Sequence, residues 1–211
     1  MDTHATPPVL WQFRQSHFNE KARWALDWKG LPHVRRSLLP ALHMPRVLWM
    51  TGQKSVPVLV LDGRAIADST RIIAALEELR PDPPLYPADA DERRRALALA
   101  DFFDEELGPH LRRTFFHDVL PHTDYAAALN ATACSPLART MHRAIFPVLR
   151  AAMRIDMRID ATGAELGRAK VRAALDRIAA ELRPSGFLAG DRFSVADLTA
   201  AALLSPLLVP P

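Results

Sequence analysis

The sequence has a single cysteine, Cys134, among 211 residues. One cysteine excludes an intramolecular disulfide, and its neighbours show no metal-ligand spacing. A chain so poor in cysteine fits a reducing compartment. The histidines at positions 110, 117 and 122 form no convincing metal-ligand set either. We therefore expect no bound metal.

Long apolar runs and blocks of like charge are also missing. No uninterrupted apolar stretch approaches the roughly 18 residues that a membrane-spanning helix needs, and the start MDTHATPPV has no basic-then-apolar signal pattern. The 27 Lys and Arg exceed the 24 Asp and Glu by only 3 and are spread along the chain. These features predict a cytoplasmic protein that binds neither membranes nor nucleic acid.

Apolar residues make up 49% of the chain, and its length allows two domains. The first part alternates strand-like and helix-like patterns, with Gly30 and Pro32 placed to end the first helix. The expected elements are a strand at 9–13, a helix from 17 to 29, a strand at 33–39, a less regular segment at 40–54, strands at 58–61 and 65–67, and a helix after residue 70. A strand-helix-strand unit followed by a hairpin and a helix predicts a four-stranded mixed sheet.

Residues 80–87, RPDPPLYP, hold four prolines and cannot continue a helix or a central strand. We therefore divide the chain into an α/β domain at 1–81, a linker at 82–87 and an all-helical domain at 88–211.

Beyond the linker, apolar residues recur at helical spacing and strand signals are absent. We expect a break or kink at Gly108-Pro109 and a second division at Pro147. A stripe of apolar residues predicts the buried face of a helix that ends before Pro184, and it consists of Val171, Leu175, Ile178 and Leu182.

Two local patterns predict turn and cap geometry. In SVPVLVLDGRAIADST, residues 55–70, Pro57 precedes a strand at a place where a cis peptide bond would make a deliberate turn. Asp62-Gly63 is a hairpin signal, and Asp68 with Ser69 precedes a helical pattern. Near the end of the chain, the run from Ser194 to Asp197 matches a capping box with Asp in place of Glu.

The predicted order of strands and helices resembles that of the glutathione S-transferase superfamily over nearly the whole chain. That family has a thioredoxin-like N-terminal domain and an all-α C-terminal domain. GFLAGDRFSVADLTAA, residues 186–201, resembles the buried-helix signature of that family. The resemblance implies glutathione as co-substrate. In the family further helix commonly follows the position of Pro211, so a less enclosed acceptor pocket is implied here.

The resemblance also implies a set of glutathione contacts. Val56 and Pro57 match the Val-cisPro pair that presents its backbone to the cysteinyl part, while Asp68 and Ser69 match the pair that holds the γ-glutamyl end. The family usually has Glu or Gln where this chain has Asp68. Lys54 is the nearest candidate for the glycine carboxylate. The alternatives are a plain helix cap for Ser69 and a solvated lysine for Lys54.

Ser16 is the expected catalytic residue, because SHFNEKARWAL resembles the SPF-x-x-K/R-V-R segment of serine-type transferases. A thiol with a pKa near 8.5 is mostly protonated at neutral pH, so a hydroxyl donor and helix N-terminal N–H groups are needed to favour the thiolate. Ser16 could instead only cap the helix. His17 and Asn19 are the other polar residues at this corner. The absence of cysteine at 16 or 19 argues against a thioredoxin-like or cysteine-type mechanism.

The implied activity is glutathione transfer to small, largely apolar electrophiles by a homodimer, in the manner of a detoxification enzyme. A non-catalytic protein of the same fold that binds apolar ligands or a protein partner is one alternative, and a glutathione-dependent isomerase or peroxidase is another. We expect the acceptor pocket between the domains. Its expected walls are Phe13, Phe102, Phe103, His110 and Phe116.

Overall fold

The computed structural model describes residues 6–132 and 134–208. These residues form two compact units. The first unit contains the described residues up to Pro81 together with Thr123–Leu149, and the second contains Asp82–His122 and the described residues from Arg150 onward. The described residues of 123–149 thus pack with the first unit although they follow the linker in sequence. The domain boundaries at 81 and 88 stay a prediction.

The first unit is built on a four-stranded mixed sheet, as the sequence predicts. The strand order is β2-β1-β3-β4, with β1 and β2 parallel and the other neighbouring pairs antiparallel. The strands are β1 at Val9–Gln12, β2 at Val34–Ser37, β3 at Val58–Leu61 and β4 at Arg64–Ala67. Asp62 and Gly63 both have positive φ, 49° and 78°, so the predicted hairpin turn is confirmed.

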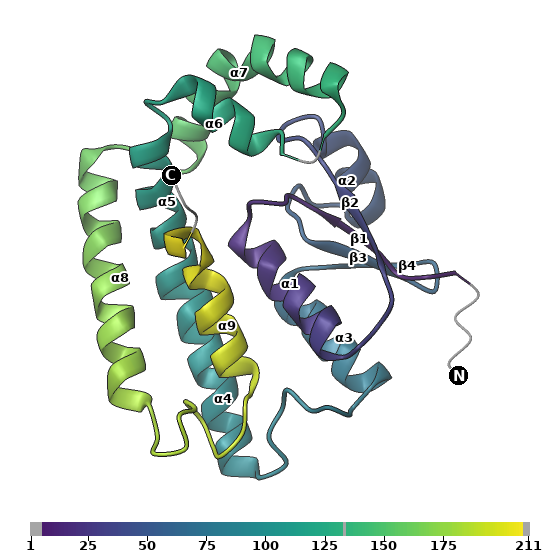
Figure 1. Ribbon diagram of the computed structural model, residues 1–211, viewed down its shortest axis with the longest axis vertical. Coiled ribbons are helices and arrows are strands. Elements are labelled where there is room, and N and C mark those ends of the chain that lie inside the picture. The colour runs from purple at the N-terminus through teal and green to yellow at the C-terminus, as the bar shows by residue number, and fades with distance from the viewer. Residues whose placement is uncertain (1–5, 133, 209–211) are drawn as a thin grey trace. The chain divides into compact units, whose positions relative to one another are not determined.

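Helices α1 at His17–Trp28 and α3 at Ser69–Leu79 pack against each other in this unit (Figure 1). Two fully buried lysines join them, Lys21 in α1 and Lys29 at its C-cap. Lys21 Nζ donates to Thr70 Oγ1 over 3.0 Å, and Lys29 forms an ion pair with Glu77. The first contact lies near the starts of the two helices and the second near their ends, so the pair is tied at both ends.

The sequence missed one helix, α2 at Met44–Thr51, because we expected residues 40–54 to be irregular. Val47 is its only buried residue, and Trp49 is 87% exposed. Met44, Val47 and Leu48 have helical spacing, but the pattern spans little more than one turn and the segment contains Pro40 and Pro45, so no clear helix signal is present in the sequence. The helix ends at Gly52, whose φ of 71° suits the C-terminal cap.

Helices α6 at Thr123–Asn130 and α7 at Pro136–Asp156 follow the linker in sequence. The predicted division at Pro147 is wrong, since α7 continues through that residue. Phe146 and His142, one turn earlier, are both buried and anchor the helix at that point. Their packing outweighs the loss of a single backbone hydrogen bond at the proline.

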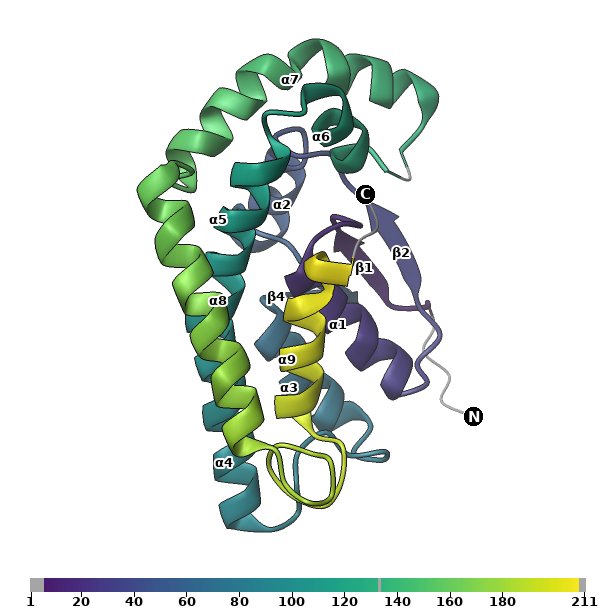
Figure 2. The same ribbon diagram turned by 60° about the vertical axis from the view of Figure 1, so that its left-hand side comes forward.

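The second unit contains α4 at Ala90–Phe102, a π-helical turn at Phe103–Leu107, α5 at Gly108–Val119, α8 at Ala161–Glu181, α9 at Val195–Leu204 and a 3₁₀ turn at Ser205–Leu208. Helix α4 packs on α9 and α5 packs on α8 (Figure 2). The break expected at Gly108-Pro109 is a π-helical turn that leads directly into α5. Such turns absorb an extra residue in a helix.

The predicted buried stripe on α8 is wrong. Leu175 is 44% exposed, and the buried face consists of small residues, Ala164, Gly167 and Ala174. A Cβ at Gly167 would lie 2.8 Å from the carbonyl oxygen of His110 on α5. The two helices therefore approach too closely for leucine, and small side chains form the contact.

The capping box at α9 is confirmed. Asp197 Oδ2 accepts from Ser194 N over 2.9 Å, while Ser194 Oγ accepts from Ala196 N. Asp197 Oδ1 also accepts from Leu188 N, which ties the preceding loop to the helix.

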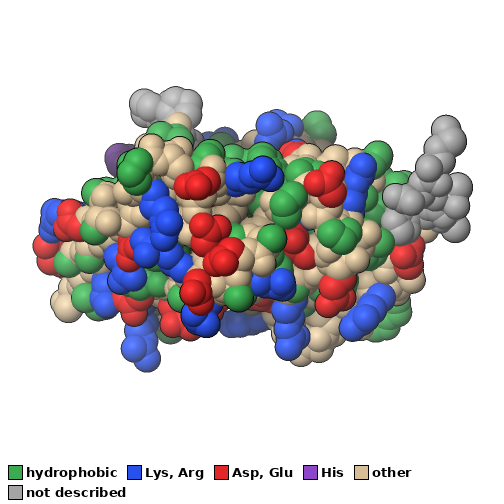
Figure 3. Space-filling view, turned by 90° about the horizontal axis from the view of Figure 1, so that it is seen from below, with side chains coloured by type: hydrophobic (Ala, Val, Ile, Leu, Met, Phe, Trp, Pro, Cys, Tyr) green, Lys and Arg blue, Asp and Glu red, His purple; other side chains and the backbone are tan. Residues whose placement is uncertain are grey.

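Basic and acidic side chains are interspersed on the face shown in Figure 3. In the part of the chain that the structure describes, we find no helix both long and apolar enough to span a bilayer.

Candidate functional site

Ser16 lies at the end of the turn from β1 into α1. It is the N-cap residue of α1, half-buried, with extended backbone, and its carbonyl oxygen accepts from Glu20 N over 2.9 Å. Within the described chain its hydroxyl accepts no hydrogen bond from the N–H groups of the helix. The Ser16 hydroxyl is therefore not occupied by the capping role that was the alternative to catalysis.

Arg23 holds the Ser16 turn, which we define as residues 13–16. Its guanidinium donates to the carbonyl oxygens of Phe13 over 3.4 Å and Arg14 over 3.0 Å, and to Gln12 Oε1 over 2.6 Å. Nε donates to Glu20 Oε2 over 2.7 Å. Burial lowers the pKa of Arg23, and the charge of Glu20 opposes that shift. Sequence reasoning missed this residue, although it is the final arginine of the motif that begins at Ser16.

The Val56-Pro57 peptide bond is cis, as predicted. The carbonyl oxygen of Pro57 accepts from Asp68 N over 3.3 Å. This bond joins the turn before β3 to the start of α3. The structure thereby brings together four of the predicted glutathione-binding residues, which are Val56, Pro57, Asp68 and Ser69.

Asp68 is the N-cap residue of α3, and Ser69 is the first residue of the helix. Asp68 Oδ1 accepts from Thr70 N over 2.9 Å and from Arg71 N over 3.1 Å. Its φ of 80° and ψ of 131° lie where L-residues are rarely found, a conformation that costs on the order of 1–3 kcal/mol. Ser69 is 3% exposed. The plain capping role considered for Ser69 therefore belongs to Asp68.

Lys54, the candidate for the glycine carboxylate, is exposed. Its carbonyl oxygen accepts from His43 Nε2 over 2.9 Å, so the hydrogen of neutral His43 is on Nε2. The neighbouring Gln53 side chain bonds Ser55, with Nε2 donating to its carbonyl oxygen over 2.9 Å and Oε1 accepting from its N–H over 2.7 Å. The Gln53 side chain is thus engaged by its neighbour, and the role of Lys54 stays a prediction.

The other polar residues near Ser16 are buried. His17 is 3% exposed and Asn19 is fully buried, and the Asn19 amide has no hydrogen-bond partner within residues 6–132 and 134–208. The expected walls of the acceptor pocket fall in different units. Phe13 packs edge-on against His43 at 4.7 Å in the first unit, whereas Phe103 is a fully buried core residue of the second.

Two family models match the chain, "Glutathione S-transferase, N-terminal domain" over residues 10–84 and "Glutathione S-transferase, C-terminal domain" over residues 142–209. The chain belongs to the glutathione S-transferase superfamily. The first match contains the cis-Pro57 turn and the start of α3, and the second contains the capping box of α9.

Similar proteins include transferases and isomerases of this superfamily. The chain is 33% identical over 133 residues to a maleylpyruvate isomerase of Ralstonia sp, a match that covers 58% of this chain and 59% of that protein. It is 31% identical over 109 residues to a probable glutathione S-transferase, parA, of Nicotiana tabacum, covering 51% and 50%. The chain thus matches between half and three fifths of the length of these two relatives.

Among solved structures, a glutathione S-transferase of Methylobacterium radiotolerans in complex with glutathione sulfonate has a TM-score of 0.67 and 25% identity. The likeness covers 97% of this chain and 80% of that one. This similarity extends through both units of the fold.

Proposed function

We propose that this protein is a glutathione-dependent enzyme. It activates the glutathione thiol and transfers glutathione, through its sulfur, to small electrophiles. One observation supports this function above the others. Within one compact unit, hydrogen bonds join the cis-Pro57 turn to the start of α3 and join α3 to α1, and the N-cap Ser16 of α1 makes no side-chain cap hydrogen bond.

In the proposed complex, glutathione adds as a short extended strand beside Val56, whose backbone lies at the cis-Pro57 turn. The α-carboxylate of the γ-glutamyl end would meet Ser69 at the positive end of α3. Asp68 Oδ1 is occupied in capping, which leaves Oδ2 to face the ligand's ammonium group. Lys54 would pair with the glycine carboxylate. The similar structure in complex with glutathione sulfonate supports glutathione as the ligand.

Ser16 would donate a hydrogen bond to the thiolate, assisted by the N-terminal N–H groups of α1. Lowering the thiol pKa by one to two units takes about 1.4–2.7 kcal/mol, which one charge-assisted hydrogen bond and a helix dipole can supply together. The sulfur then attacks an electrophilic carbon, and the leaving group departs from that carbon.

A glutathione-dependent isomerase is the second candidate, and it is favoured by the name of the relative from Ralstonia sp. Both candidates bind glutathione and need a thiolate. They differ in the substrate, since a maleyl compound carries carboxylates and a generic aryl halide carries none.

Calorimetry with glutathione is the deciding test of the shared part of this proposal. We expect binding by the wild-type protein and thiol-dependent turnover with an aryl halide or a maleyl substrate. Absence of glutathione binding would refute the assignment of Val56 and Ser69. Binding without turnover over a broad electrophile panel would identify the non-catalytic member of the fold instead.

We further propose a homodimer. Exposed apolar side chains on α2 support it, since Met44 is 38%, Leu48 48% and Trp49 87% exposed, and clustered exposed apolar side chains commonly mark an interaction surface. The cytoplasmic location stays a prediction.

A further inference from the structure

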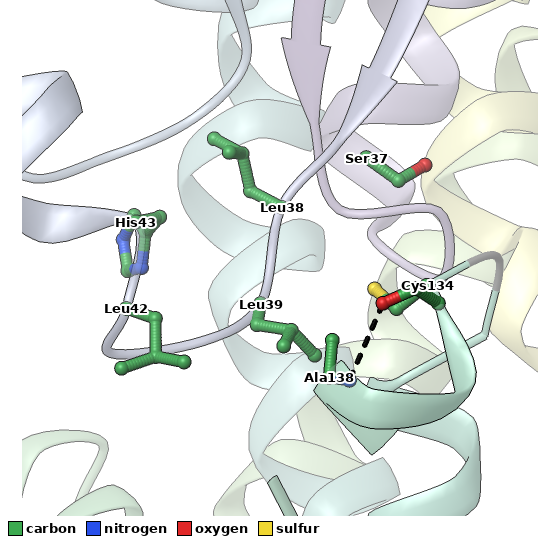
Figure 4. Close-up of a pocket in the computed structure, with 8 residues that line it drawn as sticks. Ser37, Leu38, Leu39, Leu42, His43, Cys134 and Ala138 are labelled. Atoms are coloured by element: carbon green, nitrogen blue, oxygen red, sulfur yellow. Dashed lines mark hydrogen bonds between the residues drawn. The ribbon is translucent and has the colours of Figure 1, made fainter. Parts of the chain in front are cut away.

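The segment that contains α6 and the start of α7 belongs to the same unit as the Ser16 turn, although it follows the linker in sequence. Figure 4 shows part of this arrangement. Cys134, just before α7, and Ala138, in its first turn, line a cavity together with Leu39 and Leu42, which follow β2. The segment therefore lies beside the end of β2, within reach of the neighbouring turn that follows β1.

A hydrogen bond between two amide side chains joins the end of α6 to the Ser16 turn. Gln15 Nε2 donates to Asn130 Oδ1 over 2.9 Å, although the two residues are 115 positions apart. Asn130 is 2% exposed, and its Nδ2 donates to the carbonyl oxygen of Ala126 over 2.9 Å. Because a carbonyl oxygen can only accept, this second bond determines the orientation of the Asn130 amide, and Oδ1 faces Gln15. Gln15 must therefore present its NH₂ group to α6.

The three residues that precede Ser16 are held by side chains of two helices. Arg23 of α1 donates to the carbonyl oxygens of Phe13 and Arg14, and Asn130 of α6 accepts from Gln15. Gln15 directly precedes Ser16, so the bond from α6 acts one residue away from the hydroxyl. Since that hydroxyl makes no cap bond to α1, its direction depends on how firmly the turn is held.

We propose that Asn130 is a positioning residue for thiol activation, which fixes the Ser16 hydroxyl at the glutathione sulfur by holding Gln15. This inference rests on the proposed function and extends its site from the N-terminal part of the chain to α6. Asn130 acts only through Gln15 and the turn. The effect falls on the pKa of the bound thiol, because a displaced hydroxyl donates a weaker hydrogen bond to the thiolate.

Two substitutions of similar size remove the hydrogen bond from either end. Gln15→Met removes the donor and Asn130→Leu removes the acceptor. We expect each variant to raise the pKa of the bound thiol by about half a unit or more, which leaves roughly threefold less thiolate at a pH below that pKa. The pKa is followed by the ultraviolet absorbance of the thiolate, and kcat at such a pH should fall in proportion. S-Methylglutathione, which has no thiol to ionise, should bind to the variants and to the wild type with equal affinity in calorimetry.

Thr132→Val is the matched control for loss of a bond within α6 and the turn that follows it. Thr132 Oγ1 donates to the carbonyl oxygen of Ala128, four residues back, as Asn130 Nδ2 does to that of Ala126. Thr132 makes no bond to the Ser16 turn in the described chain. This variant should keep the wild-type thiol pKa and kcat.

The double variant separates positioning from a general loss of stability. Because both substitutions remove one and the same bond, Gln15→Met combined with Asn130→Leu should raise the thiol pKa no further than either substitution alone. Full additivity of the two shifts overturns the proposal, and so does a wild-type thiol pKa in a folded single variant, even one of lower unfolding free energy. If Asn130→Leu does not fold, the half-buried Gln15→Met decides by the same criterion.

The two levels of inference fail in different ways. Absence of glutathione binding by the wild-type protein refutes the proposed function. If the wild type binds glutathione and lowers its thiol pKa, and Gln15→Met and Asn130→Leu leave that pKa unchanged, the function stands and the role of Asn130 alone is refuted.

Discussion

Replacing Arg23 by methionine is expected to lower turnover far more than glutathione affinity. The guanidinium donates to the carbonyl oxygens of Phe13 and Arg14, the residues that lead into Ser16. Methionine keeps an unbranched stem of similar reach but donates no hydrogen bond. The turn that presents the Ser16 hydroxyl would then lose the contacts that hold it, while Val56 and Ser69 lie on other segments.

The magnitude follows from burial and from the number of bonds. The Arg23 side chain is 10% exposed, so solvent screens its contacts little. A hydrogen bond to a charged group contributes about 1.5–3 kcal/mol, and the methionine variant should lose about 2–4 kcal/mol of unfolding free energy. A displacement of about 1 Å at a reacting group costs up to about 100-fold in rate. We therefore expect kcat to fall about 10- to 100-fold, with the KM for glutathione within about threefold.

The assay combines denaturant unfolding, steady-state kinetics and the pH dependence of the ultraviolet absorbance of bound thiolate. Arg35→Met is the matched control, since Arg35 also pairs with a carboxylate. Its Nη2 donates to both oxygens of Asp27 over 2.7 Å, but the Arg35 side chain is 42% exposed. Exposed pairs contribute about 0–1 kcal/mol. If Arg23→Met destabilises the fold yet keeps the bound-thiol pKa and kcat of the wild type, the positioning argument is wrong.

Three further predictions address the serine, the pH dependence and the oligomer. Ser16→Ala should retain glutathione binding by calorimetry but lose about tenfold or more in turnover, because each unit of thiol pKa changes the thiolate fraction tenfold; unchanged turnover would remove Ser16 from the mechanism. Burial lowers the pKa of the fully buried His142, so the unfolded chain binds more protons and the unfolding free energy should fall as pH drops below about 6.5. His142→Phe should flatten that dependence in denaturant titrations at several pH values, and an equally steep curve would contradict this assignment. Trp49→Glu should shift the proposed dimer toward monomer in sedimentation experiments, whereas a monomeric wild type would exclude the dimer.

Features set by neighbouring residues were predictable from sequence. The Asp62-Gly63 turn needs two positive φ angles, and its strand partners follow directly on each side. The cap at Ser194 and Asp197 likewise lies within one helical turn. Which face of a helix is buried depends on partners distant in sequence, and this was not predictable. The buried face of α8 depends on how closely α5 approaches it, which favours Gly167 over the leucines that a hydrophobic pattern selects.

The candidate site divides in the same way. Ser16, Val56 and Ser69 came from short motifs and from the family resemblance. The contact of Lys21 with Thr70 joins residues 49 positions apart, and the cavity lined by Leu39 and Cys134 joins segments still more distant. Neither has a signal in the local sequence, because folding alone brings these partners together.

Position 68 holds Asp in this chain, where the family usually has Glu or Gln, and this difference changes how the chain would hold glutathione. The shorter carboxylate turns back to its own helix, where Oδ1 accepts two backbone N–H groups. A cap of this kind contributes about 1 kcal/mol, comparable to the lower cost of the positive φ at the same residue. Asp68 therefore fixes the start of α3 first and has one oxygen left for a ligand. It follows that affinity for the γ-glutamyl end should depend mainly on Ser69 and the helix N-terminus, with Asp68 acting chiefly by holding them in place.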